Sequence, residues 1–132
     1  MLKGLNHITI AVSDINKSLD FYMNDLGFKG HVKWNAGAYL SVGELWFCLS
    51  LDKPDKKTDY THIAFDIADS DFEKFMEKLT SNNITQWKIN KSEGKSLYIL
   101  DPDGHKLEIH VGNLKGRLKS LKSKPYDGLM WL

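Results

Sequence analysis

NHITIAVSD, at residues 6–14, aligns without a gap with THIAFDIAD, at residues 61–69. In each stretch a run of β-forming residues leads into a polar residue suited to begin a helix. The alignment places His7 on His62. The chain therefore contains an internal repeat, and one structural unit is expected to occur twice.

A helical pattern follows each copy of the repeat. After the first copy, Asp14 is predicted to cap a helix that ends at Gly27, with apolar residues at helical spacing between them. After the second copy, Ser70 and Glu73 are typical of a capping box, and Asn82 is predicted to end the helix. Each copy thus begins with a strand and continues as a helix.

Three short strands are predicted after each helix. They are expected near residues 28–34, 38–42 and 45–50 in the first copy, and near residues 84–90, 96–100 and 106–111 in the second. The DPDG sequence at residues 101–104 predicts a tight turn between the last two strands. The pattern predicts an α+β fold made of two tandem βαβββ modules.

The 132 residues are expected to form a single domain. The polar stretch DKPDKKTD is interpreted as a linker, and an amphipathic helix is predicted near the C-terminus. The expected parts are a first module at 1–51, a linker at 52–59, a second module at 60–112, and a helix with a tail at 113–132.

Composition excludes several classes of function. The formal net charge of +1 argues against a general nucleic-acid-binding protein. The N-terminal apolar run is short and polar-interrupted, so we expect neither a signal peptide nor a membrane span. Cys48 is the single cysteine, which rules out an intrachain disulfide and favours a cytoplasmic location. In its apolar strand, Cys48 is expected to be a buried small residue rather than a nucleophile.

Side chains that could bind a metal recur at matched strand positions. His7 and Thr9 share one face of the first strand, and Glu108 and His110 share one face of the last. His7, His62 and Glu108 together offer two imidazoles and a carboxylate, a common set for a divalent metal with open coordination positions. From spacing alone, the matched histidines could equally be part of a metal centre or a relic of the duplication.

The first copy contains no counterpart of Glu108. The matching position falls somewhere in residues 46–48, depending on where a gap is placed. The chain therefore carries one complete ligand set. Pairing between modules, within one chain or between two, is needed to bring His7 to Glu108.

Two further groups of residues are ambiguous by composition. The loop from Asn90 to Ser96 is polar and contains glycine, which suits either a bound ion or, more commonly, a plain hairpin loop. The tyrosines and tryptophans of the strands could line a pocket, although such residues usually belong to the core.

Strings along nearly the whole chain resemble one known family. They are LNHITIAV, GAYL, LWFCLS, DYTHIAF, WKINKSEGKSLYILDPDGHKLEIHVG, RL and KPYDGL. With the duplicated βαβββ pattern, they are similar to the vicinal oxygen chelate superfamily, and within it to the fosfomycin-resistance thiol transferases of the FosA type. The resemblance implies a domain-swapped homodimer that uses Mn2+ and K+ to add glutathione to the epoxide of fosfomycin.

The resemblance also implies a role for individual residues. The ligands of Mn2+ would be His7 from one subunit and His62 and Glu108 from the other. The loop residues around K+ would be Asn90, Ser92, Gly94 and Ser96. The phosphonate would be bound by Lys88, Ser92, Tyr98 and Arg117. Thr9 would lie beside the epoxide, Trp46 would pack on the substrate, and Trp34 and Tyr39 would face the thiol, with Tyr39 helping to ionise it.

Other activities of the same scaffold remain open at this point. Bacillithiol, cysteine or water could replace glutathione, and Glu44, where this family suggests a small or polar residue, could act as a base on water. A lactoylglutathione lyase or an extradiol dioxygenase would require a fourth protein ligand or Fe2+. A metal-free protein that sequesters a drug is a further alternative, and it would have no use for the His7, His62 and Glu108 set.

Overall fold

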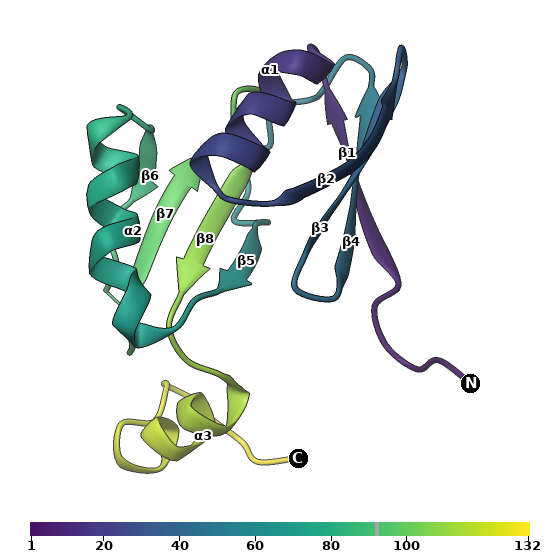
Figure 1. Cartoon of the computed structure of the whole chain (residues 1–132). Coiled ribbons are helices and arrows are strands. Elements are labelled where there is room, and N and C mark those ends of the chain that lie inside the picture. Colours follow the sequence, from purple (N-terminus) through teal and green to yellow (C-terminus); the bar gives the residue numbers. More distant parts are fainter. Residues whose placement is uncertain (92) are drawn as a thin grey trace.

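Two four-stranded sheets, each accompanied by a helical segment, form the body of the computed structural model, which describes residues 1–91 and 93–132 (Figure 1). The first module comprises β1 (His7–Val12), α1 (Ile15–Leu19), η1 (Asp20–Asp25), β2 (Lys29–Trp34), β3 (Gly37–Val42) and β4 (Leu45–Leu51). The second comprises β5 (Ile63–Asp66), α2 (Asp69–Ser81), β6 (Gln86–Lys88), β7 (Ser96–Leu100) and β8 (Lys106–His110). The last helix is α3 (Leu114–Ser123).

The two sheets have the same topology. Their strand orders are β1-β4-β3-β2 and β5-β8-β7-β6. In each, the first strand pairs in parallel with the last, and the remaining pairs are antiparallel. The α+β fold with two βαβββ modules is therefore confirmed.

Alternation along the strands separates the core from the exposed face of each sheet. In β1, Ile10 and Val12 are buried, whereas His7 and Thr9 point to the other face and are exposed. The two modules share one hydrophobic core. The Phe65 ring of β5 lies with its centroid 5.2 Å from that of Phe28 and 6.0 Å from that of Phe47 in the first module. The modules are thus joined by packing of aromatic rings.

The first helix begins as predicted but changes its winding. Asp14 caps α1 by accepting a hydrogen bond from the Lys17 backbone N–H at 3.0 Å. After Leu19 the chain continues as the π-helix η1 instead of the uniform helix that the sequence suggested. The wider turn places the adjacent Phe21 and Tyr22 both in the core, at 4% and 0% exposure.

The predicted capping box of the second helix is wrong. The N-cap of α2 is Ala68, which makes no side-chain cap bond, because the helix begins before Ser70. Asp69 and Asp71 lie in the first turn instead, where negative charge offsets the helix dipole. Glu73, the expected partner in the box, lies 3.7 Å from Lys95 Nζ.

One strand is much shorter than predicted. The strand expected at residues 84–90 is limited to Gln86–Lys88, and its register with β7 shifts within it, between Gln86 and Lys88. The other predicted strands agree with the structure to within one residue at each end.

Polar contacts between the modules surround the turn that precedes β8. The buried Tyr22 hydroxyl donates to Asp101 Oδ2 at 2.7 Å, and Asp101 Oδ1 accepts the backbone N–H groups of Asp103 and His105. His105 Nε2 lies 2.6 Å from the carbonyl oxygen of Ala11, to which it donates. Desolvation raises the pKa of Asp101, and the bond from Tyr22 opposes this rise.

We expect Tyr22→Phe to lower the free energy of unfolding by about 1–3 kcal/mol at pH 7, because the buried Asp101 carboxylate loses a donor. Without that donor the pKa of Asp101 rises further. A carboxyl whose folded-state pKa is raised loses stability as the pH increases through the interval above its unfolded value. The penalty should therefore be smaller at pH 4 than at pH 7, because the raised pKa of Asp101 favours its protonation as the pH falls. Urea unfolding at both pH values measures it, and an equal penalty at both would contradict this account.

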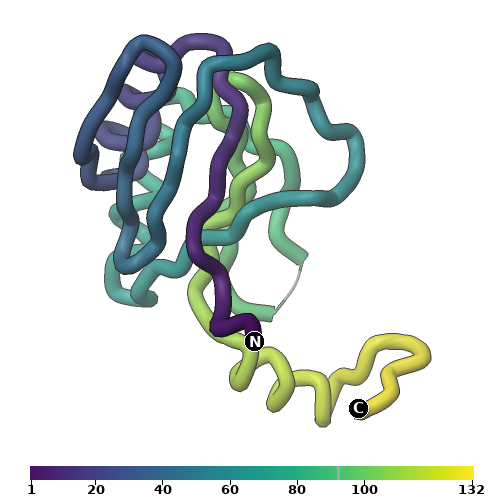
Figure 2. The backbone as a smooth tube through the Cα atoms, turned by 90° about the vertical axis from the view of Figure 1, so that its right-hand side faces the viewer, coloured from purple at the N-terminus to yellow at the C-terminus, as the bar shows by residue number. Residues whose placement is uncertain are grey.

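The C-terminal region projects from the body of the molecule (Figures 1 and 2). Asn113 caps α3 through a 2.9 Å bond from the Gly116 N–H to its Oδ1. Within the described part of the chain, no helix is long and apolar enough to cross a membrane.

Candidate functional site

The exposed face of the first sheet carries a row of aromatic rings that we call the first half-site, with Trp34, Tyr39, Trp46 and His7 in that order. Trp34 and Tyr39 lie 4.8 Å apart between ring centroids, Tyr39 and Trp46 5.2 Å, and Trp46 and His7 4.5 Å. The rings come from β2, β3, β4 and β1, and register brings them together although they are distant in sequence. Thr9 lies on the same face of β1 as His7.

The exposed face of the second sheet carries a group that we call the second half-site, centred on Glu108. His62, just before β5, places its Nε2 3.2 Å from Glu108 Oε1. The Ser96 hydroxyl donates to Glu108 Oε2 at 2.9 Å and lies 2.6 Å from His110 Nδ1. Glu108 is 8% exposed. Partners at both carboxylate oxygens hold it in one orientation.

Both candidate histidine ligands have the same nitrogen available. His62 Nδ1 lies 2.8 Å from the Tyr60 carbonyl oxygen, and His7 Nδ1 lies 2.7 Å from Asn6 Oδ1. An oxygen acceptor at Nδ1 holds the proton there and leaves the Nε2 lone pair free to bind a metal. In this tautomer Nε2 of His62 and the Glu108 carboxylate are both electron-pair donors at 3.2 Å, which favours a cation between them. The donor set therefore fits a divalent metal.

Strand register identifies the first-module counterpart of Glu108. Glu108 pairs with Ala64 in β5 and with Tyr98 in β7, and Cys48 pairs with Thr9 in β1 and with Tyr39 in β3. Cys48 thus occupies in the first sheet the place that Glu108 occupies in the second. It is 5% exposed, in agreement with the expected buried residue.

A lysine held by two tyrosines lies beside the second half-site. Lys88 Nζ donates to the Tyr60 hydroxyl at 2.5 Å and lies 4.6 Å and 4.8 Å from the ring centroids of Tyr60 and Tyr98. The bond to Tyr60 raises the pKa of Lys88 above its ordinary value, so the side chain stays cationic. Tyr98 is buried at 3% exposure and is the Cα partner of Lys88.

The loop before β7 is tied to the body from both sides. Asn90 Nδ2 donates to the Gly94 carbonyl at 2.8 Å, and Lys95 Nζ lies 2.9 Å from Asp69 Oδ1 at the start of α2. Gly94 has φ +82°, and a Cβ there would lie 2.9 Å from the Val111 carbonyl oxygen, so this position requires glycine. Ser92, expected to contact both the phosphonate and K+, lies outside the described residues.

Arg117 reaches the same loop from α3. Its Nε donates to Glu93 Oε2 at 3.1 Å, and its Nη2 donates to the Glu93 carbonyl at 3.1 Å. Arg117 and Lys88 both line one cavity of about 380 Å3. The structure thus gathers the two predicted cations for the phosphonate around one cavity.

The structure brings the predicted residues together within each half-site but does not join the two halves. His62 Nε2 lies 3.2 Å from Glu108 Oε1, whereas the His7 ring packs against Trp46 of its own sheet. Across residues 1–91 and 93–132, no group of three or more His, Cys, Asp or Glu side chains is placed to hold a metal ion. Among the described residues of one chain, His62 and Glu108 are the two predicted Mn2+ ligands whose contact is established.

Glu44 occupies the turn between β3 and β4. It is exposed and follows Gly43, which has φ +54°. His110, predicted on the same face of the last strand as Glu108, shares the Ser96 hydroxyl with it.

Sequence reasoning missed the residues that orient the others. Tyr60 contacts both Lys88 and His62, and Ser96 bonds to Glu108 rather than serving the loop alone. Tyr60 had a detectable signal, because residues two apart in an extended segment share a face. The contacts of Ser96 had none, since they depend on the pairing of β7 with β8.

A family model described as the Glyoxalase/Bleomycin resistance protein/Dioxygenase superfamily matches residues 4–109. The chain belongs to this superfamily. The match confirms the superfamily resemblance expected from the sequence. The matched residues include His7, His62 and Glu108.

Individual superfamily members are similar over nearly the full length. The glutathione transferase FosA of Serratia marcescens is 52% identical over 99% of this chain and 96% of its own length. The metallothiol transferase FosB of Staphylococcus haemolyticus is 42% identical over 96% of each chain. A crystal structure of the fosfomycin resistance protein FosX from Listeria monocytogenes, complexed with Mn(II) and a sulfate ion, superposes with a TM-score of 0.83 and 29% identity over 91% of this chain and 98% of that one.

Proposed function

We propose that this chain is a metal-dependent transferase that adds the sulfur of glutathione to the epoxide of fosfomycin and so inactivates the antibiotic. The observation that carries the proposal is the 52% identity to the Serratia glutathione transferase FosA over 99% of the chain. The similarity to FosX, a fosfomycin resistance protein, supports the same substrate. Glutathione is abundant in the reducing cytoplasm, where we place the enzyme.

The metal centre we propose combines both half-sites. His7 of one protomer, with the partner's His62 and the partner's Glu108, would bind Mn2+ in a domain-swapped homodimer. Support comes from the oxygen acceptors at Nδ1 of both histidines, which leave the Nε2 lone pairs to a metal, and from the buried Glu108 beside His62 Nε2. When bound, the metal supplies Lewis-acid stabilisation of the negative charge that develops on the epoxide oxygen.

The phosphonate would be held by Lys88, Ser92, Tyr98 and Arg117. Two of them, Lys88 and Arg117, are among the cations that line the 380 Å3 cavity beside the second half-site. Their charges offset that of the phosphonate and orient the epoxide. Thr9 would lie beside the epoxide, and Trp46 would pack on the substrate, since both share the exposed face of His7.

We propose K+ as an activator bound by the loop before β7, through Asn90, Ser92, Gly94 and Ser96. Support comes from the bond between Asn90 and the Gly94 carbonyl, which closes this loop on itself. Oxygen atoms gathered in such a loop suit a hard monovalent or divalent cation. The added positive charge would further offset the phosphonate.

The thiol would approach along the aromatic row, where Trp34 and Tyr39 are in contact. Tyr39 would help to remove the thiol proton. The sulfur–carbon bond forms as the carbon–oxygen bond of the epoxide breaks, and the released oxygen then takes up a proton. This displacement needs no covalent bond to the protein, which agrees with Cys48 being buried.

The experiment is to incubate the purified protein with Mn2+, K+ and fosfomycin, and to identify products by 31P NMR and mass spectrometry. Parallel samples contain glutathione, bacillithiol, cysteine or no thiol. We expect the glutathione adduct to form fastest. A diol in the thiol-free sample that disappears in Glu44→Gln would instead indicate hydrolysis. Intact fosfomycin bound without metal would indicate a sequestering protein, and either result would overturn the proposal.

A further inference from the structure

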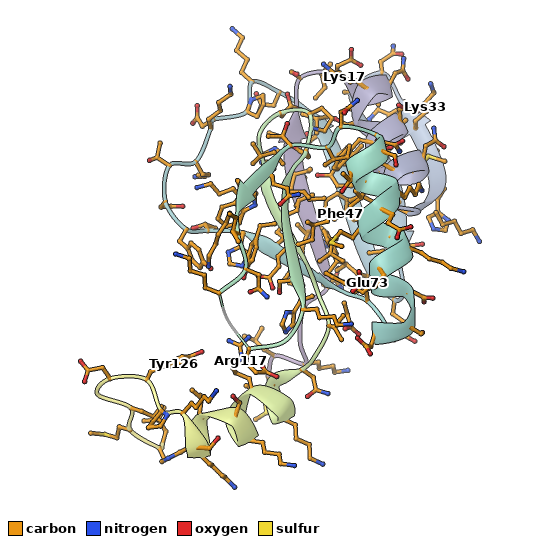
Figure 3. All side chains as sticks on the ribbon, turned by 90° about the vertical axis from the view of Figure 1, so that its left-hand side faces the viewer. Lys17, Lys33, Phe47, Glu73, Arg117 and Tyr126 are labelled. Carbon is orange, nitrogen blue, oxygen red and sulfur yellow. The ribbon has the colours of Figure 1, made fainter. Side chains whose placement is uncertain are left out.

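The C-terminal tail, the residues that follow α3, places the tyrosine Tyr126 at the cavity beside the second half-site. Tyr126 lines the cavity together with Arg117 and Glu93. Its hydroxyl accepts a hydrogen bond from Arg117 Nη1 at 3.1 Å. Figure 3 shows Arg117 and Tyr126 on the side of α3 that faces the rest of the molecule.

Arg117 is therefore held at three of its nitrogen atoms. Nε and Nη2 donate to the side chain and the backbone carbonyl of Glu93, and Nη1 donates to Tyr126. A guanidinium has five N–H groups, and these bonds account for three of them. One N–H group on Nη1 and one on Nη2 remain for the two oxygens of an anion.

A turn in the tail restrains the backbone of Tyr126. The Leu129 N–H donates to the Tyr126 carbonyl at 3.0 Å, and Gly128 adopts φ +74° to close this turn. On the opposite side, Glu93 belongs to the loop that Lys95 ties to α2. Two segments outside the sheets thus converge on one arginine from opposite sides.

The surrounding charge explains why Arg117 needs such support. Lys88, Lys91 and Lys124 line the same cavity, and Glu93 is its one carboxylate among the described lining residues. Neighbouring cations repel an arginine that carries no fixed partners. Bonds to Glu93 and Tyr126 oppose that repulsion while they leave the cavity strongly positive.

We propose that Tyr126 is a positioning residue for the phosphonate: with Glu93, it fixes the Arg117 guanidinium so that two parallel N–H groups are presented to the substrate. The inference rests on the proposed function, in which Arg117 binds the phosphonate. It makes the C-terminal tail a determinant of substrate affinity, although the tail lies outside both sheets.

The test compares fosfomycin binding, by calorimetry on the Mn2+-loaded protein, and steady-state kinetics for wild type and Tyr126→Phe. We expect the dissociation constant and the KM for fosfomycin to rise about fivefold, with kcat and the KM for the thiol within twofold. The neighbouring tail variant Asp127→Asn serves as a control and should resemble wild type. Unchanged fosfomycin affinity in Tyr126→Phe, or a higher KM for the thiol, would overturn the proposal.

A double-mutant cycle separates positioning from a general structural role. In an Arg117→Lys background, where the fork is absent, Tyr126→Phe should cause no further loss of fosfomycin affinity. The same loss in both backgrounds would show that Tyr126 does not act through Arg117. If wild type itself binds no fosfomycin, the proposed function fails, whereas normal wild-type binding with an unaffected Tyr126→Phe fails only this inference.

Discussion

Glu108→Gln is expected to lower the affinity for Mn2+ by about 100-fold or more and to reduce transferase activity with it. Loss of a residue that merely hydrogen-bonds to a metal ligand already costs about 10- to 100-fold. Glutamine has the same shape and can still accept the bond that Ser96 donates to Glu108. The change therefore removes the charge that a divalent metal needs without removing the packing.

Mn2+ binding is measured by electron paramagnetic resonance, and stability is measured by thermal unfolding of the metal-free protein. The thermal midpoint should stay near that of wild type, which separates loss of metal from loss of fold. Glu77→Gln, an equivalent change at an exposed position of α2, is the matched control and should retain full affinity. Wild-type Mn2+ binding by Glu108→Gln would remove Glu108 from the ligand set.

Mixing His7→Ala with His62→Ala is expected to restore activity that each variant lacks alone. In a swapped dimer, each site takes residue 7 from one chain and residue 62 from the other. A mixed dimer then has one site with both substitutions and one site with neither. Random assortment should recover about one quarter of wild-type activity.

The variants are unfolded together in urea, refolded and assayed with Mn2+, with each variant refolded alone as the control. A single chain gathers no complete ligand group among its described residues, which is the reason to expect complementation. If His7 instead met residues 62 and 108 within one chain, no mixture would regain activity, and the swapped arrangement would be wrong.

Most of the fold could be predicted from local sequence patterns. The alternation in β1 and the helical spacing after Asp14 reflect burial of one face, which the sequence displays directly. The errors occurred where the structure depends on contacts between segments that are distant in the sequence. The cap of α2 depends on where the chain leaves β5, and the π-helix η1 depends on fitting both Phe21 and Tyr22 into a core shared with the second module.

The candidate site divides in the same way. The repeat marked His7 and His62, and the strings shared with a known family marked Lys88, Tyr98 and Arg117. Sequence could not indicate that the Ser96 hydroxyl bonds to Glu108, or that Tyr126 bonds to Arg117. These contacts join segments whose approach is determined by strand register and by the position of α3.

By itself, the sequence determined that there are two βαβββ modules, that the histidines occupy matched positions, and that only the second module carries the carboxylate, because periodicity and composition are local properties of a chain. Only the tertiary structure decided that Cys48 stands in the place of Glu108, that an oxygen acceptor lies at Nδ1 of both imidazoles, and that among the described residues Glu108 is in contact with His62. Such facts depend on how distant strands pair and pack, and pairing energy is shared among residues that no short stretch of sequence contains.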